Sequence, residues 1–498
     1  MKKLLLCLAL LLCGCQMKEE VSNENSSIVY QIFPYSFNDS DGNGVGDING
    51  ITSKLDYIQS LGVGNIWLTP ITESPTYHKY DVIDYMSIDP LFGTIEDFDK
   101  LVEEANNRNI GIVFDLVLNH TSSKHPWFIQ AKEDLLNNRC DNEDSKCSWY
   151  NFSTEKKADY TMLGNGYYYE SGFSSEMPDL NLDEPKVREE IEKIVQFWIG
   201  HGVSGFRLDA PYHYYGGNAS KNNEFLSWLD ATVKKYKEDA FIVGEVWADT
   251  NTILKHYESD VDSFFNFSGS GTNGKIVSTL RSKNGAALAN WFVNYNKNID
   301  ALSEEAIDSV FLSNHDQGRS GAFFGNQIEK TKLMGSVLLL APGRVYVYYG
   351  EEIGMLGSGN DPNKRMPMLW SSEDNAGIPY NPPGVNYTNQ VKTSVEDQLE
   401  DKESLLNHYK LVASIRNKST LYETGQLEHV DVKNDSIYAM NLYNDEESIL
   451  VIHNFSEEEQ TIEINVESKD MDTTNKNNKL KGNTLTLQPL SSSVIYVK

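Results

Sequence analysis

Gly205-Phe-Arg-Leu-Asp209-Ala210 is a short, mainly apolar run with a carboxylate, Asp209, near its end, and the chain repeats this arrangement. FIVGEVW (241–247) carries Glu245, and VFLSNHD (310–316) ends in Asp316. Helix-like stretches separate these runs. An ionisable residue after each strand-like run is how a parallel β/α barrel presents chemistry at one rim.

Eight strand-like runs predict an α/β fold, a (β/α)8 TIM barrel. They cover Ile28–Phe33, Asn65–Leu68, Ile112–Val117, Ser204–Leu208, Phe241–Val246, Asp262–Phe267, Ile307–Leu312 and Val345–Tyr349. Helical spacing of apolar residues is clearest in Glu184–Ile199, where Pro185 suits a first turn and Gly202 follows the end. The segment Leu55–Leu61 behaves similarly, with Gly62 as its stop.

Breaks in this pattern predict the domain organisation. Residues 28–120 and 181–420 form the two parts of the barrel, and the polar, aromatic stretch 121–180 is expected to be a domain inserted after the third strand at the catalytic rim. Residues 421–498 alternate with period two and predict a C-terminal antiparallel β-sandwich domain. Within it, Lys469–Asn483 is expected to be a polar loop.

The N-terminus predicts export. Lys2 and Lys3 precede the apolar run Leu4–Leu12, a pattern typical of a secretory signal over residues 1–15 and too short to span a membrane stably. The run ends Leu-Cys-Gly-Cys15, which resembles the lipobox of bacterial lipoproteins. That resemblance implies a lipid on Cys15 and attachment to a bacterial cell membrane, on its extracellular face or in a periplasm. The alternative is an ordinary cleaved signal. Residues 16–27 are expected to be a flexible tether.

The formal net charge of −29 over 498 residues excludes nucleic acid as an expected partner, because phosphate binding needs a basic surface. It disfavours anionic substrates and leaves a neutral polysaccharide unaffected. The acidity also serves solubility. We expect a monomer.

Two cysteines lie outside the signal. Cys140 and Cys147 are close together in a polar stretch. In an oxidising compartment they are expected to form a disulfide. Metal binding is the lesser alternative, because two cysteines alone cannot complete a zinc site.

The carboxylates at the strand ends have the chemistry of a glycosidase. Side chains alternate along a strand, so Arg207 and Asp209 share a face, and the arginine favours an ionised nucleophile. Glu245 follows an apolar strand, and a less solvated carboxyl can stay protonated as general acid. Asp316 would hold sugar hydroxyls. Each alone could be a structural ion pair or a helix cap, whereas three at strand ends favour glycoside hydrolysis.

Asp39-Ser-Asp41-Gly-Asn43-Gly-Val45-Gly-Asp47 predicts a metal loop. Alternate oxygen-bearing side chains, tight glycine turns and no soft ligands favour Ca²⁺. The distal glutamate spacing of an EF-hand is missing. A solvated Asp/Gly turn is the alternative.

Six motifs together resemble the α-amylase family of retaining glycosidases (glycoside hydrolase family 13), from about Val29 to the C-terminus. They are Asp115–His120, Met177–Asn181, Gly205–Ala210, Glu245–Trp247, Phe311–Asp316 and Tyr349–Met355.

The resemblance implies roles for individual residues. Asp209 is the implied nucleophile, Glu245 the acid/base and Asp316 the transition-state stabiliser. The implied substrate-binding set is Tyr80, His78, His120, Arg207, His315, Asp361 and Arg365, with Tyr80 as an aromatic platform. Asp39, Asp41, Asn43, Asp47 and the carbonyl of Val45 match a first-loop calcium site of the family. Asn119, Asp179 and the carbonyl of His213 match a second site.

Departures from the family pattern bear on specificity. Tyr212 stands where members acting on long α-1,4-glucans often have lysine, which puts leaving-group contacts in doubt. Ala210 replaces the valine of α-1,6-specialised relatives and favours α-1,4 cleavage. We therefore expect an endo-acting α-amylase on starch and maltodextrins. The alternatives are an α-glucosidase, an oligo-1,6-glucosidase or a neopullulanase-like enzyme, and, outside enzymes, a glycan-binding lipoprotein or a transporter subunit.

Overall fold

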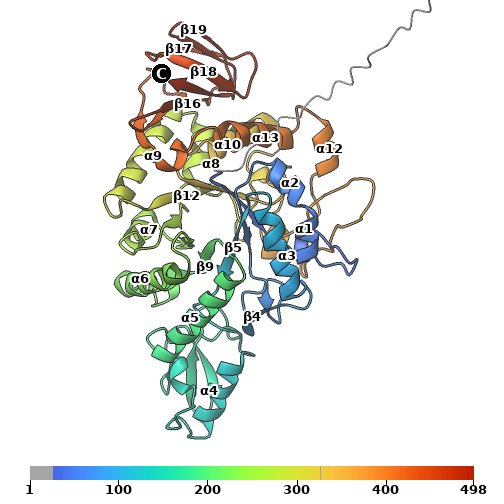
Figure 1. Ribbon diagram of the computed structural model, residues 1–498, viewed down its shortest axis with the longest axis vertical. Helices are drawn as coiled ribbons and strands as arrows, with labels where there is room; N and C mark the ends of the chain where they lie inside the picture. Colours follow the sequence, from blue (N-terminus) through green and yellow to red (C-terminus); the bar gives the residue numbers. More distant parts are fainter. Residues whose placement is uncertain (1–25, 326, 498) are drawn as a thin grey trace, which may run out of the picture.

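The computed structural model describes residues 26–325 and 327–497, and a closed barrel of eight parallel strands forms its centre (Figure 1). The strands are β1 (Ile28–Ile32), β2 (Asn65–Leu68), β5 (Gly111–Leu116), β9 (Gly205–Leu208), β10 (Phe241–Gly244), β11 (Ser263–Phe265), β12 (Ile307–Phe311) and β13 (Arg344–Tyr348). All eight predicted strands and the barrel are confirmed.

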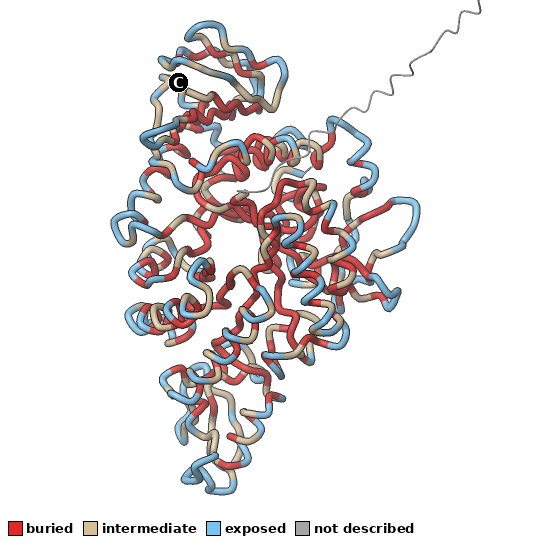
Figure 2. Tube along the Cα trace, viewed as in Figure 1, coloured by how far each residue is buried: buried red, intermediate tan, exposed pale blue. Residues whose placement is uncertain are grey.

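The order around the barrel is β1-β13-β12-β11-β10-β9-β5-β2, with every pair parallel. Asp115 on β5 lies beside Arg207 on β9 in this register. Strands covered on both faces need continuous apolar runs, which explains why all five residues of β1 are buried. Figure 2 shows this buried core passing through the middle of the molecule.

An outer layer of helices covers the barrel. Its principal members are α1 (Ile48–Ser53), α2 (Leu55–Ser60), α3 (Ile95–Asn106), α5 (Pro185–Gly200), α6 (Ala219–Tyr236), α7 (Thr250–His256), α8 (Lys275–Ser282), α9 (Gly285–Asp300), α10 (Ile328–Leu339), α12 (Val395–Glu400) and α13 (Leu405–Arg416). Helix α5 starts with Pro185 at its first turn and buries the predicted apolar stripe. Gly202 follows with φ 86°, a left-handed conformation suited to glycine.

The segment after β5 projects from the carboxyl end of the barrel and forms the lower end of the molecule in Figure 1. It contains α4 (Pro126–Leu136) and a sheet of β6 (Phe152–Ser153), β8 (Tyr167–Glu170) and β7 (Tyr160–Gly164), in that order. Phe128 of α4 packs on Tyr150 and Tyr169, each with ring centroids 5.0 Å away. These aromatic contacts give the segment its own small core.

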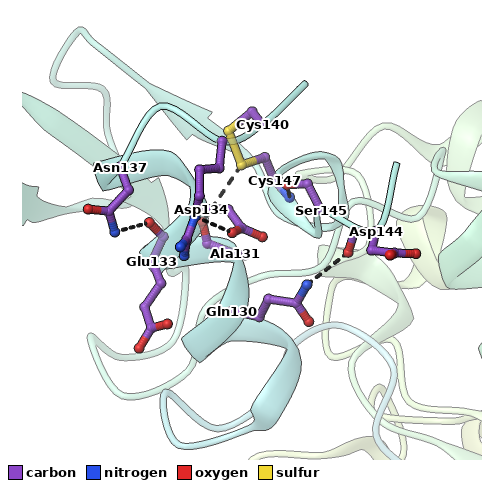
Figure 3. Close-up of a disulfide and its surroundings, with 10 residues drawn as sticks. Gln130, Ala131, Glu133, Asp134, Asn137, Cys140, Asp144, Ser145 and Cys147 are labelled. Carbon is purple, nitrogen blue, oxygen red and sulfur yellow. Dashed lines mark hydrogen bonds and ion pairs between the residues drawn. A yellow bond between two sulfur atoms is a disulfide. The ribbon is translucent and has the colours of Figure 1, made fainter. Parts of the chain in front are cut away.

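Cys140 and Cys147 form a disulfide in this segment, with Cα atoms 5.5 Å apart (Figure 3). It closes the loop that follows α4. Beside it, Gln130 Nε2 donates to the carbonyl of Asp144 at 2.8 Å, which ties α4 to the same loop.

The C-terminal part is an antiparallel β-sandwich at the opposite end of the long axis (Figure 1). One sheet contains β14 (Gln426–His429), β15 (Ile437–Tyr443), β16 (Ser448–Asn454), β21 (Ser492–Val497) and β18 (Ser468–Thr473), in that order. The other contains β17 (Gln460–Glu463), β20 (Thr484–Leu487) and β19 (Lys479–Lys481). Between them lies an aliphatic core that includes Ile437, Leu450, Ile462, Leu485 and Ile495.

The polar loop predicted for Lys469–Asn483 is wrong, because it contains most of β18 and all of β19. Strand β18 is at the edge of its sheet and, within the described part of the chain, pairs with β21 alone. An edge strand can carry charges such as Asp472, which accepts a hydrogen bond from Tyr496 Oη at 2.7 Å. The polar sequence of this edge strand therefore led to the wrong prediction of a loop.

The described chain begins at the amino end of β1, where the buried guanidinium of Arg416 donates from Nε to Ser27 Oγ at 2.8 Å. The predicted signal over residues 1–15 and the lipidation residue Cys15 lie outside the described residues. Among the described residues, no helix has the length and apolar character needed to cross a membrane.

Replacing both Cys140 and Cys147 by serine is expected to lower the free energy of unfolding by about 2–3 kcal/mol, because the disulfide restricts the unfolded chain between them. Denaturant unfolding, with hydrogen exchange of α4 as a local readout, measures the effect. Reduced wild-type protein is the control and should match the double variant. Equal stability of the oxidised wild type and the variant would contradict the expectation.

Candidate active site

Parallel strands bring their carboxyl ends to one rim, and a cavity of about 490 Å³ opens there. Asp209 and Glu245 directly follow β9 and β10, and Asp316 lies in the loop after β12. All three line the cavity. Its other lining residues are His78, Tyr80, His120, Phe173, Ser174, Met177, Ala210, Tyr212, His213, Trp247, Asp361 and Arg365.

Arg207 is the centre of the charge network beneath the cavity. Its side chain is fully buried on β9 and lies on the same face of the strand as Asp209. The guanidinium donates to Asp115 Oδ1 at 2.7 Å, to Asp209 Oδ1 at 2.9 Å and to Glu245 Oε2. The two carboxyl groups that face the cavity are thus held by one rigid cation.

Glu245 has the pKa expected of an acid. Burial raises its pKa to about 8, and the negative charges of Asp209 and Asp316 add to this, while Arg207 opposes it. The carboxyl is therefore mainly protonated at neutral pH. Burial also raises the pKa of Asp115 to about 7, against the lowering effect of Arg207.

Asp316 has the opposite environment. Its burial would raise the pKa, but His315 and the positive charges of Arg365 and Arg207 outweigh this and lower it. Arg365 donates to Asp316 Oδ1 at 2.6 Å, and His315 Nε2 lies 3.1 Å from Oδ2. This carboxylate stays charged beside a neutral acid.

Tyr80 lines one wall of the cavity, and a buried hydrogen-bond chain holds its hydroxyl. Its hydroxyl lies 2.6 Å from His315 Nε2 and donates to Asp115 Oδ2 at 3.1 Å. The Tyr80 and His315 rings stack at 5.4 Å with 5° between their planes. Burial lowers the pKa of His315 to about 3, so the ring is neutral, and Gln31 Nε2 lies 2.8 Å from its Nδ1.

The predicted sugar-binding residues fall into two groups. His78, Tyr80, His120, Asp361 and Arg365 line the cavity.

Arg207 and His315 are fully buried behind this wall and are absent from the cavity lining. His315 contacts two lining residues, Tyr80 and Asp316. Arg207 donates to two others, Asp209 and Glu245. Both therefore orient the residues that face the ligand.

Some site residues were missed from the sequence. Phe173, 46% exposed, comes from the segment after β5, and its ring lies 4.8 Å from that of His213. Trp247, 56% exposed, stacks on Phe267 at 5.2 Å. Trp247 is two residues beyond Glu245, so alternation along the strand end could have indicated it. Phe173 follows an irregular loop that gives no periodic signal.

The predicted calcium loop gathers three carboxylates. Oxygen atoms of Asp39, Asp41 and Asp47 lie within 4.8 Å of one another. Backbone amides point at them, with Gly42 N and Gly44 N each 2.7 Å from Asp39. Among the described residues, no lysine or arginine forms an ion pair with them. An uncompensated, all-oxygen donor set fits a hard cation.

The other two members of this loop bond within it. Asn43 Nδ2 donates to Asp41 Oδ2 at 3.0 Å, and Val45 N donates to Asn43 Oδ1 at 2.8 Å. Both residues thus lie in the turn that carries the carboxylates.

The second predicted metal set is only partly brought together. Asn119 Nδ2 donates to Asp179 Oδ1 at 3.0 Å. Burial raises the pKa of Asp179 to about 7, and the charges of Glu170 and Asp159 contribute. The carbonyl of His213 accepts from Gly216 N at 3.1 Å. This set stays a prediction.

Comparison with known proteins agrees with this geometry. The family profile described as "Alpha amylase, catalytic domain" matches residues 31–425, and "Alpha-amylase SusG C-terminal domain" matches residues 438–494. Alpha-amylase 3 of Dictyoglomus thermophilum is 39% identical over 484 residues, covering 95% of this chain and 93% of that protein.

Two further relatives show the breadth of the family. Oligo-1,6-glucosidase of Parageobacillus thermoglucosidasius is 30% identical over 522 residues, covering 86% of this chain and 90% of that protein. The solved structure of Eubacterium rectale Amy13B has a TM-score of 0.90 at 38% identity and covers 95% of each chain. The chain belongs to the α-amylase family, glycoside hydrolase family 13, and is a glycosidase.

Proposed function

We propose that this glycosidase cleaves internal α-1,4-glucosidic bonds in starch and maltodextrins, with retention of anomeric configuration. One observation carries the proposal: Asp209 and Glu245 face one cavity and share the guanidinium of Arg207. Retention requires two closely placed carboxyl groups with different protonation states.

The reaction follows from these two groups. Asp209 attacks the anomeric carbon while Glu245 gives its proton to the leaving oxygen, so a glycosyl ester forms as the glycosidic bond breaks. Glu245, now a carboxylate, then takes a proton from water. The resulting hydroxide attacks the same carbon and releases Asp209.

The surrounding residues hold the sugar. Tyr80 offers an aromatic face on which an apolar sugar face can stack. The charged carboxylate of Asp316 binds hydroxyl groups and favours a distorted ring, and Arg365 keeps it charged and in place. His120 and His78 are further hydroxyl partners at the cavity wall.

Two features support α-1,4 cleavage. Ala210, next to the nucleophile, lines the cavity with φ 47°. Its methyl group takes less of this wall than the valine that α-1,6-specialised relatives carry at the same position. The relative named Alpha-amylase 3 points the same way.

The oligo-1,6-glucosidase relatives favour a second candidate, exo-cleavage of short α-1,6-linked or branched glucans. Product profiles on starch, pullulan and isomaltose separate the two activities. Internal cleavage gives a spread of maltooligosaccharides early in the reaction, whereas exo-cleavage gives one small product.

We also infer that Ca²⁺ occupies the acidic loop of Asp39, Asp41 and Asp47, with Asn43 and the carbonyl of Val45 as further ligands. Asn119, Asp179 and the carbonyl of His213 form a second proposed site. In the first loop the ion would offset the repulsion among three crowded carboxylates, and at the second position it would balance the buried charge of Asp179, so that both ions would stabilise the fold.

The proposed setting is a bacterial cell surface. The N-terminal pattern supports export and a lipid on Cys15, and the monomeric enzyme would meet a neutral α-glucan that its net charge of −29 does not repel. Labelling with a radioactive fatty acid in wild type and Cys15→Ser tests the anchor. Equal labelling of both would reject Cys15 as its site.

Asp209→Asn is expected to lower kcat on starch by roughly 10³-fold or more, because an amide cannot form the glycosyl ester. Release of reducing ends measures the rate. Asp308→Asn is the matched control: Asp308 is buried on β12 outside the cavity lining, and its variant should keep kcat. Normal turnover by Asp209→Asn would refute the nucleophile.

The value of kcat/KM is expected to fall as pH rises through about 8, because the general acid must carry its proton and Glu245 loses it there. With a glycosyl fluoride, whose leaving group needs no proton, Glu245→Gln and the wild type should both form the glycosyl ester without this alkaline limb. Burial raises the pKa of Glu351 to about 7 beneath the rim, so Glu351→Gln, assayed on starch, is the control and should retain the limb. A limb that persists in Glu245→Gln would assign it to another group.

Removing calcium with a chelator is expected to lower the free energy of unfolding by about 2.7 kcal/mol if the ion was present at about 100 times its Kd. Thermal unfolding with and without added Ca²⁺ measures this. Asp41→Asn should reduce the chelator effect, whereas Asp431→Asn, on the β-sandwich surface, should leave it unchanged. Identical Tm values for wild type with chelator and with Ca²⁺ would remove the calcium proposal.

A further inference from the structure

Lys79 occupies a backbone conformation that its side chain disfavours. It lies between the cavity-lining residues His78 and Tyr80, and its φ is 66°. L-residues other than glycine rarely adopt this left-handed region, because Cβ comes too close to the following carbonyl oxygen. A strained residue between two ligand-facing residues must be stabilised by its surroundings.

The side chain of Lys79 supplies that stabilisation from a buried position. It is 3% exposed, and its ammonium lies 2.6 Å from Asp89 Oδ2, whose side chain is 6% exposed. The ammonium also donates to the carbonyl of Ser74 at 3.3 Å. A buried ammonium without such partners would carry a large desolvation cost.

Both partners lie at the base of the loop that carries Lys79. Ser74 directly follows β3 (Thr72–Glu73), and Asp89 directly follows β4 (Asp84–Ile88). Asp89 accepts from the backbone N–H of Ser74 at 3.2 Å and of Leu91 at 3.0 Å, so it is fixed before the ammonium binds. The ion pair therefore ties the middle of the loop to its two ends.

The ion pair of Lys79 points away from the cavity. The Lys79 side chain is drawn inward to Asp89, while the side chains on either side of it face the cavity. Tyr80 Oη lies 2.6 Å from His315 Nε2, and Tyr80 N donates to His78 Nδ1 at 3.2 Å. The left-handed residue Lys79 lies between His78 and Tyr80 in the chain.

We propose that Lys79 is a positioning residue: its buried ion pair with Asp89 holds the loop in the one backbone conformation that presents His78 and Tyr80 to the sugar at the cleaved bond. This inference rests on the proposed cleavage of an α-glucan in this cavity. Lys79 acts through its two neighbours and does not line the cavity.

The loop has a second brace, so loss of Lys79 should misplace the two residues without unfolding the barrel. Asp81 is buried and accepts hydrogen bonds from Ser74 Oγ at 2.7 Å and from Thr76 Oγ1. This brace lies next to Tyr80 and does not involve the ammonium.

Lys79→Met and Lys79→Ala are expected to lower kcat/KM per folded enzyme by roughly 10- to 100-fold, since small misplacements of binding groups cost that much. Lys79→Gly removes the ion pair but adopts φ 66° without strain, so it should recover part of the loss. Asp89→Asn should resemble Lys79→Met, and the double variant should be no worse than either single change. Kinetics are measured well below each variant's Tm.

Arg344→Met is the matched control. The variant loses a less buried ion pair, that of Arg344 with Glu423, 2.7 Å away at the amino end of β13. Its Tm should fall while kcat/KM stays within about twofold, because the pair is remote from the cavity. A Lys79→Ala enzyme that loses Tm but keeps kcat/KM, as this control does, would overturn the positioning role.

A readout independent of turnover separates this inference from the proposed function. The imidazole of His315 reports the position of Tyr80 through their 2.6 Å contact, and its ring nitrogen signals can be followed by NMR with selectively labelled histidine. They are expected to shift in Lys79→Ala and to move back toward wild type in Lys79→Gly. Unchanged signals in Lys79→Ala would refute the inference even if the wild type failed to hydrolyse starch.

Discussion

One buried guanidinium organises the site: Arg207 faces the carboxyl groups of Asp115, Asp209 and Glu245. A single positive charge cannot balance three negative charges in a medium that solvates ions poorly. At least one carboxyl must keep its proton, and burial together with the neighbouring charges selects Glu245. Proton storage for the proposed reaction is thus a consequence of charge balance around β9.

The same principle separates the roles of the other carboxylates. Asp316 forms an ion pair with Arg365, a second buried cation, and stays charged. It lines the same cavity as Glu245. Two acidic groups with opposite protonation states then face one cavity. Environment, more than residue type, makes one of them an acid and the other an electrostatic anchor.

Much of this could be predicted from the sequence because the barrel needs continuous apolar strands, each followed by its functional group. Asp209 and Glu245 come directly after such strands, so local pattern and position agree. The predictions failed where neighbouring elements determine the outcome. β18 is polar because only one of its edges is paired, and Phe173 reaches the cavity through a loop without periodicity.

Lys79 illustrates a further limit. A lysine in a polar loop suggests a solvated surface charge. Here the backbone of Lys79 is in the left-handed region that favours glycine, and its side chain is buried. Its role becomes clear only from its partners, the carbonyl of Ser74 and Asp89, which directly follow β3 and β4. Likewise, Gln31 interrupts an apolar strand for no reason visible in the sequence, and the structure shows that its amide contacts the ring of His315.

The hydrogen bond from Arg416 to Ser27 holds the chain where it enters the barrel. Entry is at the amino ends of the strands, and the cavity opens at their carboxyl ends, so the two lie at opposite poles. Ser26, where the described chain begins, therefore lies at the pole away from the mouth of the cavity. Attachment of the described domain at Ser26 would thus leave its point of attachment on a different face from the one that meets a polymer or a granule.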